Sequence, residues 1–576
     1  MSTPYDLVIR GGQLIDGTGA PMREADVAIL GGRIAAVGPV LGTGKDEIDA
    51  RGLMVTPGFV DVHTHFDGQV TWDNRLVPSS GHGVTTVVMG NCGVGFAPCR
   101  PEQRDMLVKL MEGVEDIPEV VMVDGLPWNW ETFPDYLDAL AQRELDIDVA
   151  AQIPHSALRI YVMGERAARQ EAPTADDLAQ MRALVAEGIS AGGFGVTTSR
   201  NMMHRTRAGE IAPSLYSDVE ELCALAEGLN DAGAGVFQII PAPVEDASEE
   251  FDLLRTVAER GKRPLSFTLL DVPGQKGAGW RPVLDQLSEA NAQGLKITGQ
   301  VAPRPVGMFF GLDLSLHYFS SHPSYKAIAH LSLAERVERM RDPAFRAQLL
   351  SEQPEDSNPT TLQLIDAFRG TIPWGDRPNY EPQRGDRMAE RAAAAGVPLA
   401  EYAYDALLER DGSALFYLAA ANYSEGNLDA VRTMLGHPNT VMALADGGAH
   451  YGLICDASFP TYYLQRWVRD ASEAQRIPLP QAIAEMTSRT ADLVGLADRG
   501  RLSVGMKADI NVIDMESLRL DVPTIAYDLP AGGKRMQQPA AGYVATIVSG
   551  TVTYRHGEHS GALPGRLVRR QDAMAA

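Results

Sequence analysis

Short apolar runs that alternate with helical patterns fill the middle of this 576-residue chain and constrain its fold more than any other feature. Such alternation is typical of βα units that build a parallel sheet. Helical patterns at 175–191, 218–232 and 250–260 separate several of the runs. The predicted strands are 58–62, 84–89, 147–153, 194–198, 236–240, 265–270, 295–300 and 441–445. Eight repeats predict a closed (β/α)₈, TIM-like barrel over residues 57–497. A doubly wound open sheet is the alternative, but no Gly-x-Gly-x-x-Gly opens a helix after the first strand.

Both ends of the chain have the pattern of short β-strands. Near the N-terminus, residues 5–10, 26–30 and 33–37 are predicted strands, with Gly-Gly turns after the first run and between the other two. Residues 508–513 and 543–554 repeat the pattern near the C-terminus. Because chain termini often lie close together, we predict that residues 1–56 and 498–576 form one small composite β-sandwich.

One connection between predicted strands is too long for a barrel loop. About 140 residues separate positions 300 and 441, with a helical pattern at 331–348 and a Pro-, Gly- and Asp-rich stretch at 371–387. Connections of this length are usually functional lids or inserted subdomains. We predict an insertion over the barrel mouth at residues 301–386.

Composition and charge exclude several classes of partner. The formal net charge of −24 argues against binding to nucleic acid or to an anionic membrane. The sequence shows neither the pattern of a signal peptide nor an apolar stretch of about eighteen residues or more, so we expect no membrane segment. The cysteines at 92, 99, 223 and 455 show no disulfide framework, which favours the cytoplasm. A homo-oligomer is compatible with this composition.

Two histidines, His63 and His65, follow the first predicted strand two positions apart. Side chains i and i+2 of an extended chain lie on one side, so both imidazoles can bind one divalent ion, and zinc suits them. Functional residues of such barrels lie at the C-terminal strand ends, where Cys92 follows strand 2 and Asp446 follows strand 8. These four residues satisfy zinc, and the carboxylate can carry a proton from an activated water to a leaving group. Alternatively, Cys92 is an inert buried thiol and Asp446 caps a helix or stabilises a turn.

Other polar residues near the same strand ends are candidates for substrate binding. His155 follows strand 3, Arg200 and Arg205 follow strand 4, and His450 follows Asp446. Arginines suit an anionic group of a substrate, with pairing to surface acids as the alternative. His155 has the alternative of satisfying only local backbone groups.

Four segments resemble sequences of one known family. They are 6–19, 55–65 with both histidines, 90–95 with Cys92, and 505–514 together with Gly565-Arg566 near the end. They resemble the amidohydrolase superfamily, and within it the D-aminoacylase (N-acyl-D-amino-acid deacylase) group, over nearly the whole chain. The resemblance implies that Cys92 binds metal in place of a carbamylated lysine and that the terminal segments form a β-sandwich.

The chain departs from this family at strands 5 and 6. The resemblance implies a metal-binding histidine at the end of each, but this chain offers Ile240 and Leu269 or close neighbours. Gln238, Thr268 and Asp271 lie near, but amide and hydroxyl oxygens are poor zinc ligands beside imidazole. We therefore expect one zinc ion per chain, held by His63, His65, Cys92 and Asp446.

Together with these patterns, the resemblance implies a zinc-dependent amidohydrolase that acts on carbon–nitrogen bonds other than peptide bonds. Its small-molecule substrate is an N-acyl amino acid or a related amide, cleaved by metal-activated water with Asp446 as the catalytic residue. One alternative is hydrolysis of a lactone, ester or cyclic imide on the same scaffold. The other is a non-catalytic binding or scaffold protein that has lost part of the metal centre.

Overall fold

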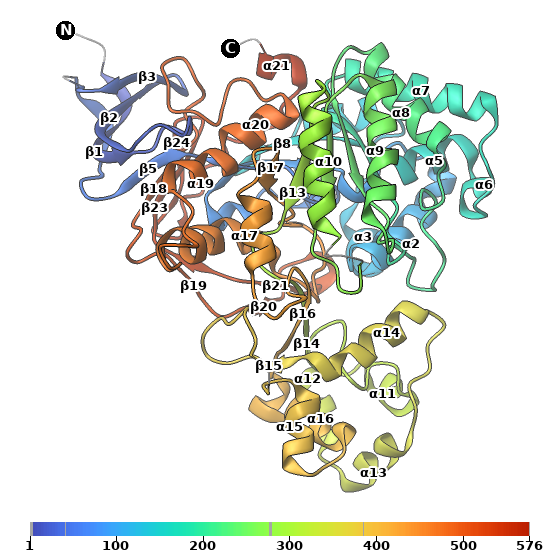
Figure 1. Ribbon diagram of the computed structural model, residues 1–576. Coiled ribbons are helices and arrows are strands. Elements are labelled where there is room, and N and C mark those ends of the chain that lie inside the picture. The colour runs from blue at the N-terminus through green and yellow to red at the C-terminus, as the bar shows by residue number, and fades with distance from the viewer. Residues whose placement is uncertain (1–3, 41, 276–278, 384, 575–576) are drawn as a thin grey trace.

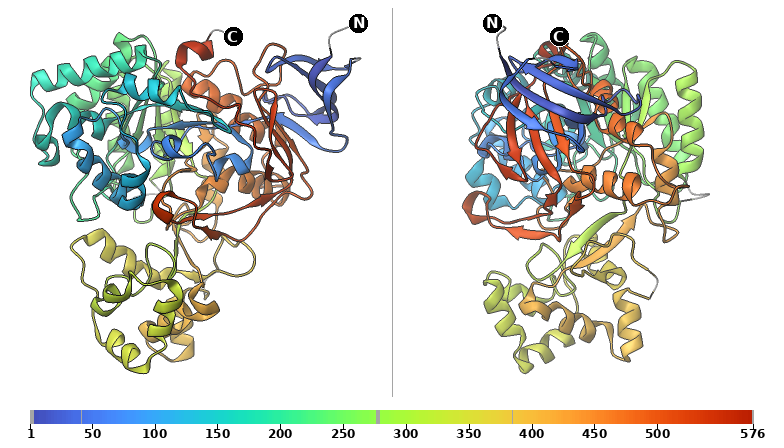
Figure 2. Two further views of the ribbon diagram at one scale, coloured as in Figure 1. Left: turned by 180° about the vertical axis from the view of Figure 1, so that it is seen from behind. Right: turned by 90° about the vertical axis from the view of Figure 1, so that its left-hand side faces the viewer.

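The computed structural model describes residues 4–40, 42–275, 279–383 and 385–574. It consists of a central barrel, a sheet built from both ends of the chain, and a separate lobe of helices joined to the barrel through β-strands (Figures 1 and 2). Of the described helices, none has the length and apolar character needed to cross a bilayer.

The barrel contains eight parallel strands within the described part of the chain, and the third is divided in two at Gln152. The strands are β6 (Phe59–Asp61), β7 (Val84–Met89), β8 (Asp148–Ala151) with β9 (Ile153–Pro154), β10 (Gly195–Ser199), β11 (Val236–Ile240), β12 (Leu265–Thr268), β13 (Ile297–Val301) and β17 (Thr440–Met442). Every residue of β7 is buried, because helices cover the outer face and side chains fill the interior. The predicted barrel is confirmed, and all eight predicted strands overlap observed ones.

The barrel has one seam that no strand ladder closes in the described chain. The two edges are β6 and β17, which are paired on their other sides to β7 and β13. Only the segments that follow these strands are joined: the His65 amide donates to Gly447 O at 2.8 Å, and the Asp446 amide donates to His63 O at 3.1 Å. The seam therefore ends at the residues singled out as metal ligands.

Helices cover the outside of the barrel and its loops (Figure 1). The sequence defines their starts: Thr174 and Asp177 form a capping box before α7, and the Asp218 side chain accepts a bond from Glu221 N before α8. These helices are α1 (Gln69–Trp72), α2 (Arg104–Val114), α3 (Glu119–Gly125), α4 (Phe133–Leu140), α5 (His155–Met163), α6 (Glu165–Ala168), α7 (Ala175–Ser190), α8 (Val219–Asp231), α9 (Ala247–Gly261), α10 (Trp280–Ala292), α17 (Asp429–Leu435), α18 (Phe459–Tyr462), α19 (Leu479–Met486) and α20 (Ser488–Val494). A short helix, α21 (Arg570–Met574), lies near the C-terminus.

Strands from both ends of the chain form one nine-stranded sheet in the described residues, in the order β25-β24-β23-β18-β5-β1-β2-β3, with β4 beside β1. The antiparallel pairing of β5 with β18, for example Thr56 with Asn511, joins the two ends as predicted. The strands are β1 (Tyr5–Leu14), β2 (Arg23–Leu30), β3 (Arg33–Gly38), β4 (Gly44–Asp49), β5 (Met54–Pro57), β18 (Ile510–Ile513), β23 (Tyr543–Val548), β24 (Thr551–Arg555) and β25 (Glu558–His559). Two short ladders, β19 (Arg519–Leu520) with β22 (Ala540–Ala541) and β20 (Thr524–Ala526) with β21 (Arg535–Gln537), precede β23.

The predicted Gly-Gly turn after residue 10 is wrong, because β1 continues through it. Gly11 has a φ of +63°, and the register to β2 shifts between Ile9 and Gly12, which makes a β-bulge. A Cβ on Gly12 would lie 2.3 Å from a methyl carbon of Val55, so glycine permits a close approach of two strands here.

The inserted lobe has its own hydrophobic core, which includes Phe310, Phe319, Tyr404 and Phe416. Its elements are β14 (Val306–Phe310), α11 (Pro323–Ile328), α12 (Leu333–Met340), α13 (Pro343–Ser351), α14 (Pro359–Ala367), β15 (Ile372–Pro373), α15 (Met388–Ala395), α16 (Leu399–Leu407) and β16 (Phe416–Ala421). Because β14 pairs with β16 and the core continues past residue 386, we infer that the inserted unit spans 306–421.

Two further observations concern the helices inside this lobe and its position on the barrel. The helical pattern at 331–348 is two helices, because Pro343 starts α13 with Asp342 as its cap. The lobe contacts loops at the C-terminal ends of the barrel strands: Ser315 Oγ donates to Asp116 Oδ2 at 2.8 Å, and Asn358 Nδ2 donates to Thr206 O at 3.4 Å. The insertion therefore lies over the barrel mouth.

Candidate metal centre

His63 and His65 continue the course of β6 beyond its last paired residue. The amide and hydroxyl of Thr64, which lies between them, both donate to Val88 O, so Thr64 faces β7. The two imidazoles consequently lie on one side of the chain, with ring centroids 5.7 Å apart. Both side chains are buried, with exposures of 2% or less.

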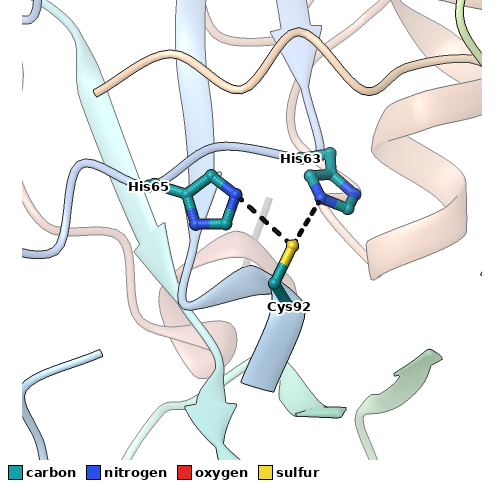
Figure 3. A group of neighbouring side chains, drawn as sticks. All are labelled: His63, His65 and Cys92. Carbon is teal, nitrogen blue, oxygen red and sulfur yellow. Dashed lines mark hydrogen bonds between the residues drawn. The ribbon is translucent and has the colours of Figure 1, made fainter. Parts of the chain in front are cut away.

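Cys92 approaches both rings from the tight turn that follows β7 (Figure 3). Its Sγ lies 3.4 Å from His63 Nε2 and 3.5 Å from His65 Nε2. The turn needs glycine on both sides, because Gly90 and Gly93 have positive φ and a Cβ on Gly90 would lie 2.3 Å from Gln152 O. Cys92 itself has a φ of +56°, and the side-chain amide of Asn91 fixes the turn by donating to Thr64 O and Val88 O.

Asp446 reaches the same rings from the loop after β17. Its Oδ1 lies 3.5 Å from His63 Nε2 and 3.6 Å from His65 Nε2, and it has no hydrogen-bond partner in the described chain. Asp446 and His450 both have positive φ, and a Cβ on Gly448 would lie 2.8 Å from the Phe66 amide nitrogen. The Gly-Gly sequence therefore lets this turn pack directly on the segment of His65.

The protonation of these groups suits a divalent ion. Burial lowers the pKa of His63 to about 4 and of His65 to about 3, so both rings are neutral at pH 7 and offer lone pairs. Burial raises the pKa of Cys92 well above its usual range, with Glu115 and Asp446 adding to the effect. A thiolate here consequently needs a cation beside it. Among the described residues, His63, His65 and Cys92 are the one histidine, cysteine or acid group compact enough to hold a metal ion, and this donor set fits zinc.

Two buried residues that the sequence analysis did not identify contact the histidines at Nδ1, the ring nitrogen that faces away from Cys92. His63 Nδ1 lies 2.7 Å from Gln300 Oε1, and the Gln300 amide donates to Ser266 Oγ. His65 Nδ1 lies 3.4 Å from Glu115 Oε1. Gln300 ends a predicted strand, so its position at the barrel mouth is a signal that could have found it. Glu115 follows α2 directly, and no spacing in the sequence points to it.

The four predicted substrate-binding residues have different surroundings. His450 lies beside the candidate metal ligands, with Nε2 3.3 Å from Glu115 Oε2 and its ring centroid 6.3 Å from that of His65. His155 is held by Thr198 and Glu221 at 2.8 and 3.0 Å. Arg200 donates to Glu250 Oε1 and Ser217 O, and Arg205 donates to the carbonyls of Met202 and Gly209. Within the described chain, the hydrogen bonds of His155, Arg200 and Arg205 thus go to a hydroxyl, acids and carbonyls near them, and not to His63, His65, Cys92 or Asp446.

The similarity of this chain to known proteins extends over nearly its whole length. The model of the Amidohydrolase family matches residues 46–554. A D-aminoacylase of Alcaligenes xylosoxydans xylosoxydans is 27% identical over 99% of each chain. An N-acyl-D-aspartate deacylase of the same organism is 28% identical over 99% of this chain and 96% of its own length.

Solved structures share the fold. N-acyl-D-glutamate deacylase from Bordetella bronchiseptica, complexed with zinc and a phosphonate inhibitor, has a TM-score of 0.66 and 24% identity over 98% of this chain and 100% of its own. A D-aminoacylase structure gives the same TM-score, identity and coverage. Since the family model covers most of the sequence, and the His63-x-His65 segment contributes to a compact group that could hold a metal ion, this chain belongs to the amidohydrolase family.

Proposed function

We propose that this protein is a zinc-dependent hydrolase that cleaves the amide bond of an N-acyl amino acid, with N-acyl-D-amino acids as the leading substrate class. The observation that carries the proposal is the meeting of His63, His65 and Cys92 beside an unpartnered Asp446 oxygen at the barrel mouth. The substrate class comes from relatives with full-length similarity, which are named D-aminoacylase and N-acyl-D-aspartate deacylase.

The roles of the residues follow from their positions. His63, His65 and Cys92 bind the ion, which when bound polarises a carbonyl oxygen and lowers the pKa of a water molecule. Burial raises the pKa of Asp446, while His63 and His450 oppose the shift. A carboxylate with a raised pKa is a better base, so Asp446 Oδ1 can take a proton from the attacking water and return it to the leaving nitrogen. His450, with 20% of its side chain exposed, lies where it can contact substrate.

We propose one zinc ion per chain. The ends of β11 and β12 carry aliphatic Ile240 and Leu269, and Gln238 and Thr268 nearby are uncharged. The nearby acid, Asp271, accepts a hydrogen bond from the Ser424 amide through Oδ2. One related D-aminoacylase has been described as having a binuclear metal centre with one-metal activation and second-metal attenuation. A single ion is therefore consistent with activity on this scaffold.

The test is hydrolysis of a panel of N-acetyl amino acids of both configurations by the zinc-loaded protein. We expect turnover of one or more N-acyl-D-amino acids. Asp446→Ala should lower kcat by about 10²–10⁴-fold, the usual contribution of a general acid or base. His63→Ala should abolish turnover and zinc retention while the circular dichroism spectrum is unchanged.

The matched control is His330→Ala, which removes an exposed histidine of the inserted lobe. It should keep the activity and the zinc content of the wild type. Zinc-loaded wild type that cleaves no N-acyl amino acid of either configuration, or full activity of His63→Ala, would contradict the proposal.

A further inference from the structure

Glu115 is a buried acid whose two oxygens face two different imidazoles. Its side chain is 1% exposed, with Oε1 3.4 Å from His65 Nδ1 and Oε2 3.3 Å from His450 Nε2. Neither oxygen has a hydrogen bond of good geometry to any described group. A buried carboxyl without polar neighbours is strongly destabilising, so the two rings are the partners that make its burial tolerable.

The contact with His65 determines which ring nitrogen can bind a metal. His65 Nε2 faces Cys92 Sγ, whereas Nδ1 faces Glu115. An acceptor at Nδ1 keeps the ring proton there and leaves the Nε2 lone pair free for the ion. His63 has a related arrangement, with Gln300 Oε1 hydrogen-bonded at its Nδ1 and Cys92 Sγ at its Nε2, whereas Glu115 Oε1 lies 3.4 Å from His65 Nδ1 without hydrogen-bond geometry. Glu115 and Gln300 thus hold the two rings in matching orientations.

The contact with His450 connects the same carboxyl to the loop of Asp446. His450 comes four residues after Asp446, and both residues have left-handed backbone conformations. The His450 amide also donates to the backbone oxygen of Glu115 at 2.5 Å. Glu115 therefore holds this turn at two points, through its main chain and through its side chain.

We propose that Glu115 is a positioning residue that keeps the ligand His65 and the Asp446–His450 turn in a fixed relation. The inference rests on the metal centre proposed above and adds a residue outside the set of ligands. Glu115 touches neither the ion nor the substrate in this role. Its loss should weaken zinc binding, because His65 is free to rotate, and should slow turnover, because Asp446 is less well placed.

The experiment measures the zinc affinity of the full-length protein by competition with a chromophoric chelator. Glu115→Met keeps a similar length but has no oxygen acceptor, and we expect about 10–100-fold weaker zinc binding. Glu115→Gln keeps one oxygen and should recover most of the affinity. At saturating zinc, kcat of Glu115→Met should fall at least tenfold on any substrate found for the wild type, while KM stays within about threefold.

The matched control is Glu485→Met, which removes another buried glutamate whose partners are Tyr463, Gln481 and Arg489. It should keep zinc affinity within twofold. If Glu115→Met does not fold, Glu115→Asp takes its place, since its shorter side chain withdraws the carboxyl from both rings and should also weaken zinc binding.

Wild-type zinc affinity in the folded Glu115→Met or Glu115→Asp variant would overturn the inference. So would equal losses in Glu115→Met and Glu485→Met. The proposed function fails separately, when the wild type binds zinc but hydrolyses no N-acyl amino acid, because the zinc affinities of the variants are measured without substrate.

Discussion

Single residues of the metal centre could be predicted to the extent that they follow strand ends. His63, His65, Cys92 and Asp446 each come shortly after a strand that the apolar pattern reveals, and the structure brings them together. Residues that support them from a helix end have no such signal, and Glu115 is the example. Arg200 illustrates another limit, because local sequence does not reveal that its guanidinium donates to Glu250, fifty residues away.

At this scale, Cys92 should be protected from alkylation while zinc is bound. A metal-bound thiolate reacts poorly, and removing the ion exposes the sulfur to the reagent. We expect the fraction of Cys92 labelled by iodoacetamide, measured by peptide mass spectrometry, to rise several-fold after chelation. Cys99 is an internal control, since its Sγ donates to the neighbouring carbonyl of Arg100 and it does not belong to the compact group of ligands. Equal labelling of Cys92 in both states would identify it as an ordinary cysteine.

Among the elements, a buried network of charges joins the barrel to the terminal sheet. Arg499 Nη1 donates to Asp148 Oδ2 on β8 at 2.6 Å, and Lys507 Nζ lies 3.0 Å from the same oxygen. Lys507 also donates to Asp509, directly before β18. The sequence predicted both β units but not this joint, because Arg499 and Asp148 are 351 positions apart and neither has a local pattern that marks the other.

The joint predicts a pH dependence of stability. Burial alone would raise the pKa of Asp148, but Lys507 and Arg499 outweigh it and hold the pKa near 2, below the 3.8 of a free aspartate. A lowered folded-state pKa gives stability that is complete above the unfolded pKa and is lost as the pH falls toward 2. Asp148→Asn should therefore cost about 3–5 kcal/mol at pH 7, and this difference from the wild type should shrink between pH 4 and pH 2.

Urea unfolding at several pH values measures this difference. The control is Asp231→Asn, which breaks an ion pair between Asp231 and Arg182 that is 40% exposed on both sides and should cost at most about 1 kcal/mol. A free-energy difference for Asp148→Asn that stays constant from pH 7 to pH 2 would show that the carboxylate charge is not what stabilises the joint.

For the molecule as a whole, sequence periodicity predicted the architecture better than its boundaries. Alternating strands and helices define the barrel locally, so eight strands could be recognised. The end of the insertion could not be recognised, because β16 (Phe416–Ala421) is a strand through its pairing with β14, about a hundred residues earlier, and with β15. Its sequence, Phe-Tyr-Leu-Ala-Ala-Ala, has no alternation of apolar and polar residues that would mark it.

One zinc ion per molecule is the prediction at this scale. Elemental analysis of the zinc-loaded protein after buffer exchange should give one zinc per chain, because the described chain offers one compact group of ligands. Cys92→Ser should reduce the retained zinc well below one. Anomalous scattering that shows two fully occupied ions about 3.5–4 Å apart, the spacing of dinuclear sites, would mean that further residues act as ligands.

The open seam between β6 and β17 means that a bound ion would affect the stability of the barrel as well as catalysis. His63 and His65 follow the β6 edge of the seam and Asp446 follows the β17 edge, and in the described residues two main-chain hydrogen bonds join these segments. An ion held by the two histidines and contacted by Asp446 would connect the two edges of this seam. Binding of the ion would then also stabilise the closed barrel, because the bound state needs both edges in place.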